Sequence, residues 1–207
     1  MKMTTSDLLS PAILGNIRAE IRNVIARVLP AVNAVSDSGP GWTRPSYSDL
    51  ESQAHALIEA EASALRLEVN RDAAGNLFAR MAGLDRGAAA LYMGSHLDTV
   101  SQGGAYDGQA GVVGTLAVLS ALRVCNITPP TDIVLVIIRA EESVWFPVSY
   151  VGSRAAIGLL DAEDFEALRS DTGRSLADHM ADQGYDAKAA RCQTPLAPAR
   201  VLEFHIE

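Results

Sequence analysis

Cysteine is scarce in this sequence: only Cys125 and Cys192 occur among 207 residues. Two thiols are too few for a disulfide framework, and their spacing is not that of zinc ligands. We therefore expect ordinary buried or half-buried thiols. The first residues, MKMTTSDLLSPAIL, carry one lysine and an interrupted apolar stretch, which makes a poor signal peptide. A cytoplasmic, reducing location follows as the expectation.

Basic residues and long apolar runs are also scarce. The chain has 17 Lys and Arg against 25 Asp and Glu, a formal net charge of −8. No basic stripe is available to neutralise phosphates, which argues against a nucleic-acid partner. No apolar run reaches the roughly 18 residues of a membrane span, so no membrane partner is expected. The 48% hydrophobic and 20% charged residues that are present are typical of a soluble globular protein with a sizeable core.

Apolar spacing predicts alternating helices and strands. Helical spacing is found at 11–29, 48–65 (opened by a Ser48–Glu51 capping box), 111–124, and in the short segments 161–168 and 175–184. Strands are expected on both sides of a turn at 72–75, at 88–93 and at 132–138. The last run consists mostly of β-branched residues, which is typical of a central parallel strand covered on both faces. This order predicts an α/β fold with a sheet flanked by helices.

The stretch from Gly94 to Gly111, GSHLDTVSQGGAYDGQAG, carries the clearest chemistry. It places His96 at a strand end, Asp98 two residues later, and Asp107 after a glycine-rich loop. Imidazole and carboxylate groups suit Zn²⁺ or Mn²⁺. Because a metal-bound histidine usually donates its second ring nitrogen to a carboxylate, Asp98 is expected to orient His96. A solvent-exposed histidine at a strand end is the alternative interpretation of an isolated His-x-Asp pair.

Two adjacent carboxylates, Glu141 and Glu142, follow the strand at 132–138. Such a pair repels and costs free energy unless a cation offsets it, although a solvated loop pair is the common alternative. Open α/β sheets bind ligands at the carboxyl ends of their strands, where both this acidic pair and His96 are expected. The acidic pair therefore joins His96 as a candidate site.

Other polar residues have weaker assignments. His55 lies inside a predicted helix with no partner four residues on, so it is expected to be a surface or packing histidine. His179 is expected at the surface, beside Asp178 and Asp182. Arg154 could hold a substrate carboxylate or form a structural ion pair.

The segments GSHLDTV, GGAYDG, EES and the terminal VLEFHIE together resemble a known signature. It is that of the di-metal amidohydrolases that include N-carbamoyl-L-amino acid hydrolase, allantoate amidohydrolase and β-ureidopropionase. These in turn resemble the aminoacylase and carboxypeptidase-type zinc exopeptidases. The resemblance runs from about Gly41 to the last residue. It implies a three-layer, zinc-exopeptidase-like (phosphorylase/hydrolase-like) α/β fold with a mixed sheet, incomplete in this chain.

The resemblance also implies a ligand set. His96, Asp107 and His205 would hold one divalent ion, and Asp107 would bridge to a second ion held by Glu142. The ions would be Zn or Mn, with Co and Ni as further candidates. A cis peptide bond is implied directly after Asp107.

Catalytic roles follow from the same resemblance. Glu141 would be the general base that takes a proton from the attacking water and delivers it to the leaving nitrogen, with Asp98 as the second catalytic residue. Glu203 and Glu207 would lie near the ligands or the substrate. Trp145, in EESVWF, stands where many members of the family have arginine.

The implied reaction is hydrolysis of a C–N bond in a ureido group. The substrate would be an N-carbamoyl-L-amino acid or allantoate, giving ammonia and carbon dioxide beside the amine product. Chains of the family are considerably longer, so residues 1–207 are expected to be the N-terminal part of the catalytic domain. The lid or dimerisation domain and a C-terminal catalytic segment would be absent, and the piece alone would be inactive or weak.

Two alternatives stay open. One is a dipeptidase or aminoacylase-type metallohydrolase with the same metal chemistry. The other is a non-catalytic fragment that acts only as a folding or interaction module. A homodimer is expected of the full-length protein.

Overall fold

A mixed five-stranded sheet forms the centre of the computed structural model, which describes residues 10–197 and 199–206. The strands are β1 (Glu68–Arg71), β2 (Leu77–Met81), β3 (Leu91–His96), β4 (Ile133–Ile138) and β5 (Arg200–Glu203). Their order across the sheet is β1-β2-β4-β3-β5. β3 runs parallel to β4 and β5, whereas the β1–β2 and β2–β4 pairs are antiparallel. The predicted mixed sheet is confirmed, with the β-branched run of β4 at its centre.

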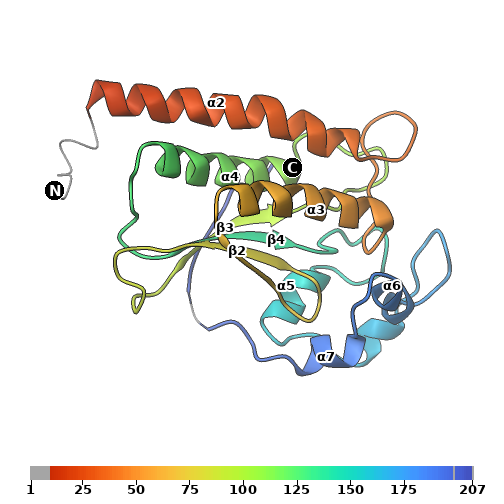
Figure 1. The fold of residues 1–207 in the computed structure, drawn as a ribbon. Coiled ribbons are helices and arrows are strands. Elements are labelled where there is room, and N and C mark those ends of the chain that lie inside the picture. The colour runs from red at the N-terminus through yellow and green to blue at the C-terminus, as the bar shows by residue number, and fades with distance from the viewer. Residues whose placement is uncertain (1–9, 198, 207) are drawn as a thin grey trace.

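Three long helices lie on the same side of this sheet (Figure 1). They are α2 (Pro11–Ala34), α3 (Asp49–Ala64) and α4 (Gln109–Val124). α4 connects the parallel strands β3 and β4 and packs against β3, while α2 lies against α4 and α3 packs on β1 and β2. A long connection of this kind is what a parallel pair requires. The main hydrophobic core lies between these helices and the sheet.

The first helix is longer than the apolar spacing predicts. α2 continues past Leu29, through Pro30, and ends at Ala34. Proline removes one backbone hydrogen bond inside a helix and usually bends or stops it. Here Val32 is fully buried beyond the proline, in line with Val24 and Val28. Packing of this last turn against the core therefore offsets the missing hydrogen bond.

Shorter helices form a second layer near the C-terminal ends of β3 and β4 (Figure 1). They are α5 (Val151–Ala156), the 3-10 turn η1 (Glu163–Glu166), α6 (Leu176–Asp182) and α7 (Ala187–Cys192). They enclose a second core cluster around Phe146. The helix predicted at 161–168 is only the turn η1, because Phe165 is its one buried side chain and Leu168 is exposed. Cys192 is also exposed, contrary to the expectation of a buried thiol, because it ends α7; Cys125 is half-buried as expected.

His179 corrects another expectation, because it is buried rather than at the surface. Its Nε2 lies 2.8 Å from the hydroxyl of Thr172, and its ring meets the edge of Phe146 at a centroid distance of 5.8 Å. Burial lowers the pKa of His179. The side chain packs into the second core cluster, which the neighbouring aspartates in the sequence could not reveal.

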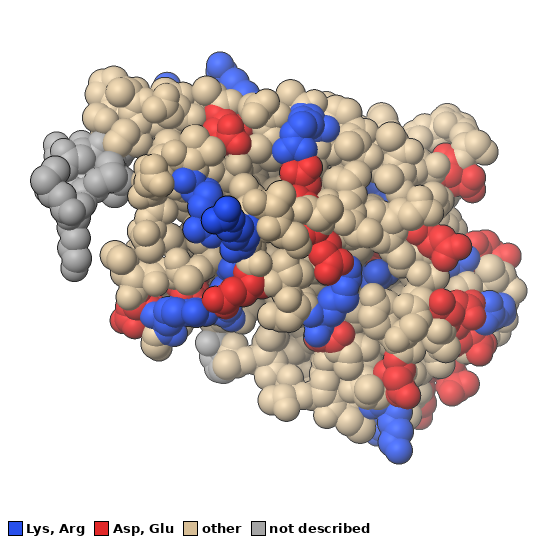
Figure 2. All heavy atoms as spheres, in the orientation of Figure 1, with Lys and Arg blue, Asp and Glu red and all other residues tan. Residues whose placement is uncertain are grey.

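Charged side chains of both signs are interspersed on the face of the molecule shown in Figure 2. Arginines pair with acidic neighbours at several places on the chain, such as Arg27 with Glu61 and Arg86 with Glu68. Within the described residues, none of the helices combines the length and apolar character needed to cross a bilayer.

His55 is fully buried in α3, which confirms the packing alternative and excludes the surface one. Neither of its ring nitrogens has a hydrogen-bond partner among the described residues. A buried polar group without a partner costs free energy, and the cost rises steeply if the group is charged. Burial therefore lowers the pKa of His55 well below its usual value, with Arg139 and Arg71 adding to the shift.

This burial predicts a pH-dependent stability. An unfolded histidine takes up a proton as the pH falls below about 6.5, whereas buried His55 stays neutral, so folding loses stability there. A His55→Leu variant lacks this penalty. The free energy of unfolding of the variant should therefore improve relative to the wild type by roughly 1 kcal/mol per pH unit between pH 6.5 and 5.5. Urea unfolding at pH 7.5, 6.5 and 5.5 measures this difference, and a difference independent of pH would contradict the prediction.

Candidate active site

Three side chains with metal-binding chemistry meet at one edge of the sheet. His96 ends β3, Asp107 lies in the loop before α4, and Glu142 follows β4. One ligand atom of each lies within 4.8 Å of the others. Nε2 of His96 is 3.5 Å from Oδ1 of Asp107. His96 pairs in register with Ile138 across the parallel strands, so both strands end at the same edge, as expected for a ligand site.

Asp98 connects His96 to the acidic pair, Glu141 and Glu142. Nδ1 of His96 lies 3.0 Å from the main-chain oxygen of Asp98 and 3.4 Å from its Oδ1. The Asp98 carboxylate is fully buried and accepts hydrogen bonds from the Ser46 hydroxyl at 2.6 Å and from the backbone N–H groups of the acidic pair, both at 3.1 Å. Asp98 therefore contacts the imidazole, as expected, and also holds the loop after β4. Ser46 was missed because it lies 52 residues away in sequence and belongs to no motif.

The charges of these groups are strongly coupled. Burial alone would lower the pKa of His96, but Asp107 and Asp98 outweigh it and raise that pKa well above its usual value. His96 in turn lowers the pKa of Asp107. Burial, together with Asp98 and Asp107, raises the pKa of Glu142 to about 7. Three carboxylates around one imidazole leave a shortage of positive charge, which a bound cation would relieve.

A divalent ion fits this group. Oδ1 of Asp107 is buried and has no hydrogen-bond partner among the described residues. One imidazole nitrogen and two carboxylate oxygens are donors that zinc and manganese accept. The unsatisfied oxygen and the donor set both favour bound cation charge among His96, Asp107 and Glu142.

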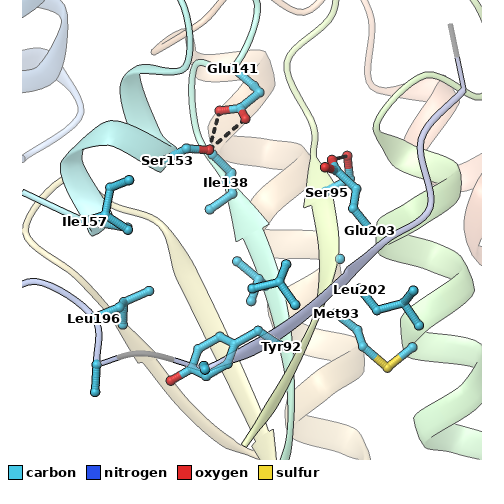
Figure 3. Close-up of a pocket in the computed structure, with 16 residues that line it drawn as sticks. Tyr92, Met93, Ser95, Ile138, Glu141, Ser153, Ile157, Leu196, Leu202 and Glu203 are labelled. Carbon is cyan, nitrogen blue, oxygen red and sulfur yellow. Dashed lines mark hydrogen bonds between the residues drawn. The ribbon is translucent and has the colours of Figure 1, made fainter. Parts of the chain in front are cut away.

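Glu141 lies beside this group and faces a cavity of about 320 Å³ (Figure 3). The hydroxyl of Ser153, from α5, lies 2.7 and 2.9 Å from its two carboxylate oxygens. Burial raises the pKa of Glu141, although Ser153 opposes the shift. Ser95 and Glu203 line the same cavity, and the Ser95 hydroxyl donates to Glu203 at 2.9 Å. Glu141 therefore combines an opening to a cavity with a raised affinity for protons.

His205 lies outside the three-residue group. Its side chain is half-exposed, and its Nδ1 is 3.8 Å from Oε1 of Glu203. After the larger effect of His96, His205 also contributes to lowering the pKa of Asp107. Its role as a ligand stays a prediction. Glu207 lies outside the described residues.

The expectation of a cis peptide after Asp107 is wrong, since the described residues contain no cis peptide bond. The loop instead approaches His96 through Gly108, which has φ +67°. A Cβ atom at Gly108 would lie 2.6 Å from the His96 carbonyl oxygen and 2.7 Å from its Nδ1. Only glycine combines this left-handed backbone with so close an approach.

Arg154 in α5 and Trp145 in the loop after β4 have structural contacts. Arg154 pairs with Asp164 at 2.6 Å, which favours the structural ion pair over a substrate contact. Trp145 is buried, and its indole N–H donates to the Thr99 carbonyl at 2.7 Å. Trp145 thus ties the loop after β4 to the loop after β3.

Comparisons with known proteins agree with this geometry. Residues 76–177 match Peptidase family M28. The chain is 35% identical to N-carbamoyl-L-amino acid amidohydrolase of Geobacillus stearothermophilus, over 81% of this chain and 41% of the relative. It is 30% identical to allantoate amidohydrolase of Bacillus subtilis, over 81% and 40%. The crystal structure of a hydantoinase/carbamoylase family amidase from Burkholderia ambifaria matches with a TM-score of 0.75 and 26% identity, over 84% of this chain and 43% of that one.

Fold and site together define the class: an α/β domain similar to the M28 peptidases and amidohydrolases, with an imidazole and carboxylates gathered at the edge of a mixed sheet. Within that class, the chain is similar to the hydantoinase/carbamoylase amidohydrolases, so the resemblance that the motifs indicated is confirmed. The chain spans less than half the length of the relatives that it matches.

Proposed function

We propose that the protein is a metal-dependent amidohydrolase that cleaves non-peptide C–N bonds in ureido groups, with N-carbamoyl-L-amino acids or allantoate as substrates. The convergence of His96, Asp107 and Glu142, together with the neighbouring Glu141 that lines a cavity, carries the proposal. The names of the relatives, an N-carbamoyl-L-amino acid amidohydrolase and an allantoate amidohydrolase, support the substrate class.

Two divalent ions, zinc or manganese, belong to this proposal. His96, Asp107 and His205 would hold one ion, and Asp107 and Glu142 the other. Bound ions would polarise the attacked carbonyl and lower the pKa of the attacking water. The buried, unpartnered oxygen of Asp107 supports this assignment.

The residues of the chain would perform the proton transfers. Glu141, with the raised pKa that burial causes, would take a proton from the attacking water and deliver it to the leaving nitrogen. Ser153 would hold the Glu141 carboxylate in place, and Asp98 would hold both His96 and the backbone of the acidic pair. Homodimerisation and a cytoplasmic location stay predictions.

A substrate panel tests the proposal. The full-length protein, supplied with Zn²⁺ or Mn²⁺, should release ammonia from N-carbamoyl-L-amino acids or allantoate, and should cleave N-acetyl amino acids and dipeptides far more slowly. Ammonia release should disappear after treatment with a chelator and return on addition of the ion. Cleavage of dipeptides or N-acyl amino acids alone would indicate the peptidase or aminoacylase alternative, and full activity in chelator would contradict a metal-dependent reaction.

A further inference from the structure

The backbone that carries the acidic pair is held by side chains from three distant parts of the chain. At the end of β4, the N–H of Arg139 donates to Oδ1 of Asn76 at 2.9 Å. The next N–H, that of Ala140, donates to Oε1 of Glu51 at 2.9 Å. The two N–H groups of the acidic pair itself donate to Asp98. Four consecutive amides therefore have side-chain acceptors, and only Asp98 among these acceptors was a candidate site residue in the sequence.

Among these acceptors, Glu51 also holds the side chain of Arg139. It is fully buried in the first turn of α3. Besides the N–H of Ala140 on Oε1, its Oε2 accepts the N–H of Tyr47 at 2.7 Å and Nη1 of Arg139 at 3.0 Å. The guanidinium of Arg139 is itself buried and stacks over the rings of Tyr47 and Tyr185. Glu51 thus bridges the start of α3 and two successive residues at the end of β4.

Ala140 shows why this bridge matters to the site. Its φ is +50°, a left-handed conformation that is strained for a residue other than glycine. It persists where the surroundings hold the peptide on both sides. The N–H of Ala140 is held by Glu51, and its carbonyl accepts the N–H of Val151 at 3.1 Å. Because Ala140 directly precedes the acidic pair, its conformation sets the direction in which the pair leaves the strand.

We propose that Glu51 is a positioning residue, which holds Arg139 and Ala140 so that the acidic pair lies beside His96 and Asp107. This inference rests on the proposed function for the roles of the acidic pair. The competing explanation is a buried ion pair that stabilises the fold without any specific effect on the site.

Asp132 offers a matched control at the opposite end of β4. It is also buried, and it accepts a backbone N–H from Gly83 at 2.8 Å and a guanidinium contact from Arg80 at 2.7 Å. Asp132→Asn therefore removes a comparable carboxylate with the same kinds of partners, away from the acidic pair. A merely structural role predicts the same consequences for Glu51→Gln and Asp132→Asn.

The experiment compares Glu51→Gln with Asp132→Asn and the wild type by native-state amide hydrogen exchange. A glutamine cannot satisfy both backbone amides and the guanidinium. Losing a hydrogen bond to a charged group changes the equilibrium constant for local opening by a factor of about ten or more. In Glu51→Gln, the amides of residues 140–142 should exchange at least about tenfold faster than in the wild type, relative to the amides of β2. In Asp132→Asn, the exchange rate of these amides should be unchanged. Zn²⁺ affinity, measured by calorimetry where both variants are folded, should fall by about tenfold or more only in Glu51→Gln, as for other residues that support metal ligands.

Each outcome decides the proposal. Exchange that rises equally in β2 and at 140–142, or Zn²⁺ affinity that matches the control, would overturn it. If the wild type binds no Zn²⁺, the metal assignment fails. The exchange pattern then still tests whether Glu51 fixes the backbone of residues 140–142. Should Glu51→Gln not fold, the Glu51→Gln/Ala140→Gly double variant replaces it, because glycine accepts the left-handed φ without strain. That variant should keep the fast exchange and the weak Zn²⁺ affinity.

Discussion

Replacing Glu141 by glutamine is expected to slow ammonia release from the ureido substrate by about 10²- to 10⁴-fold, the usual contribution of a general base. Glutamine has nearly the same shape and can still contact the Ser153 hydroxyl, which lies 2.7 and 2.9 Å from the two carboxylate oxygens. It cannot accept the proton of the attacking water at neutral pH. The steady-state kcat on the substrate that the panel identifies is the measurement.

The same variant should still bind its metal ion, because Glu141 lies outside the group formed by His96, Asp107 and Glu142. Metal content after dialysis therefore separates a lost base from a lost ion. Glu166→Gln, the same substitution at an exposed glutamate, provides the control and should leave kcat unchanged. An unchanged kcat in Glu141→Gln with metal retained would remove Glu141 from the mechanism.

Asp107→Asn is expected to weaken the affinity for Zn²⁺ or Mn²⁺ by at least about 100-fold. Changes to residues that merely support metal ligands already cost about 10- to 100-fold, and a ligand should cost more. The substitution replaces a charged carboxylate in the three-residue group by a neutral amide. No described residue forms a hydrogen bond with the buried Oδ1 that could replace the lost contact with the ion. Calorimetric titration of the folded variant measures the affinity.

Asp161→Asn is the matched control for this substitution, because Asp161 is exposed and lies far from the site in the sequence. The affinity of the Asp161→Asn variant for Zn²⁺ or Mn²⁺ should equal that of the wild type. Equal affinities in Asp107→Asn and the wild type would show that Asp107 is not a ligand, and the di-metal assignment, in which it bridges both ions, would fail with it.

Local pattern was enough to predict most elements of the sheet layer. The apolar run of β4 and the turn between β1 and β2 depend on neighbouring residues, so β-branching and turn residues indicate them directly. The elements that the sequence misjudged are those whose length depends on whether distant residues pack against them. α2 continues past Pro30 because Val32 packs into the core, and the segment at 161–168 lacks an apolar face for more than the turn η1.

The candidate site divides in the same way. Two groups were visible in the sequence, because a strand end followed by His96 or by the acidic pair is a local feature with its own chemistry. Their supporting residues were not visible. Glu51, Asn76 and Ser46 lie from 52 to 89 residues away from the groups that they hold, and no spacing rule connects them.

The sequence by itself determined the class of fold, the relatives and the segments that carry imidazole and carboxylate groups, because each depends on residue chemistry at short range. Only the tertiary structure decided that His96, Asp107 and Glu142 meet within 4.8 Å, and that buried Glu51 and Asp98 hold the strained turn between strand and acidic pair. The physical reason is that a hydrogen bond or a shared ion depends on how distant segments pack.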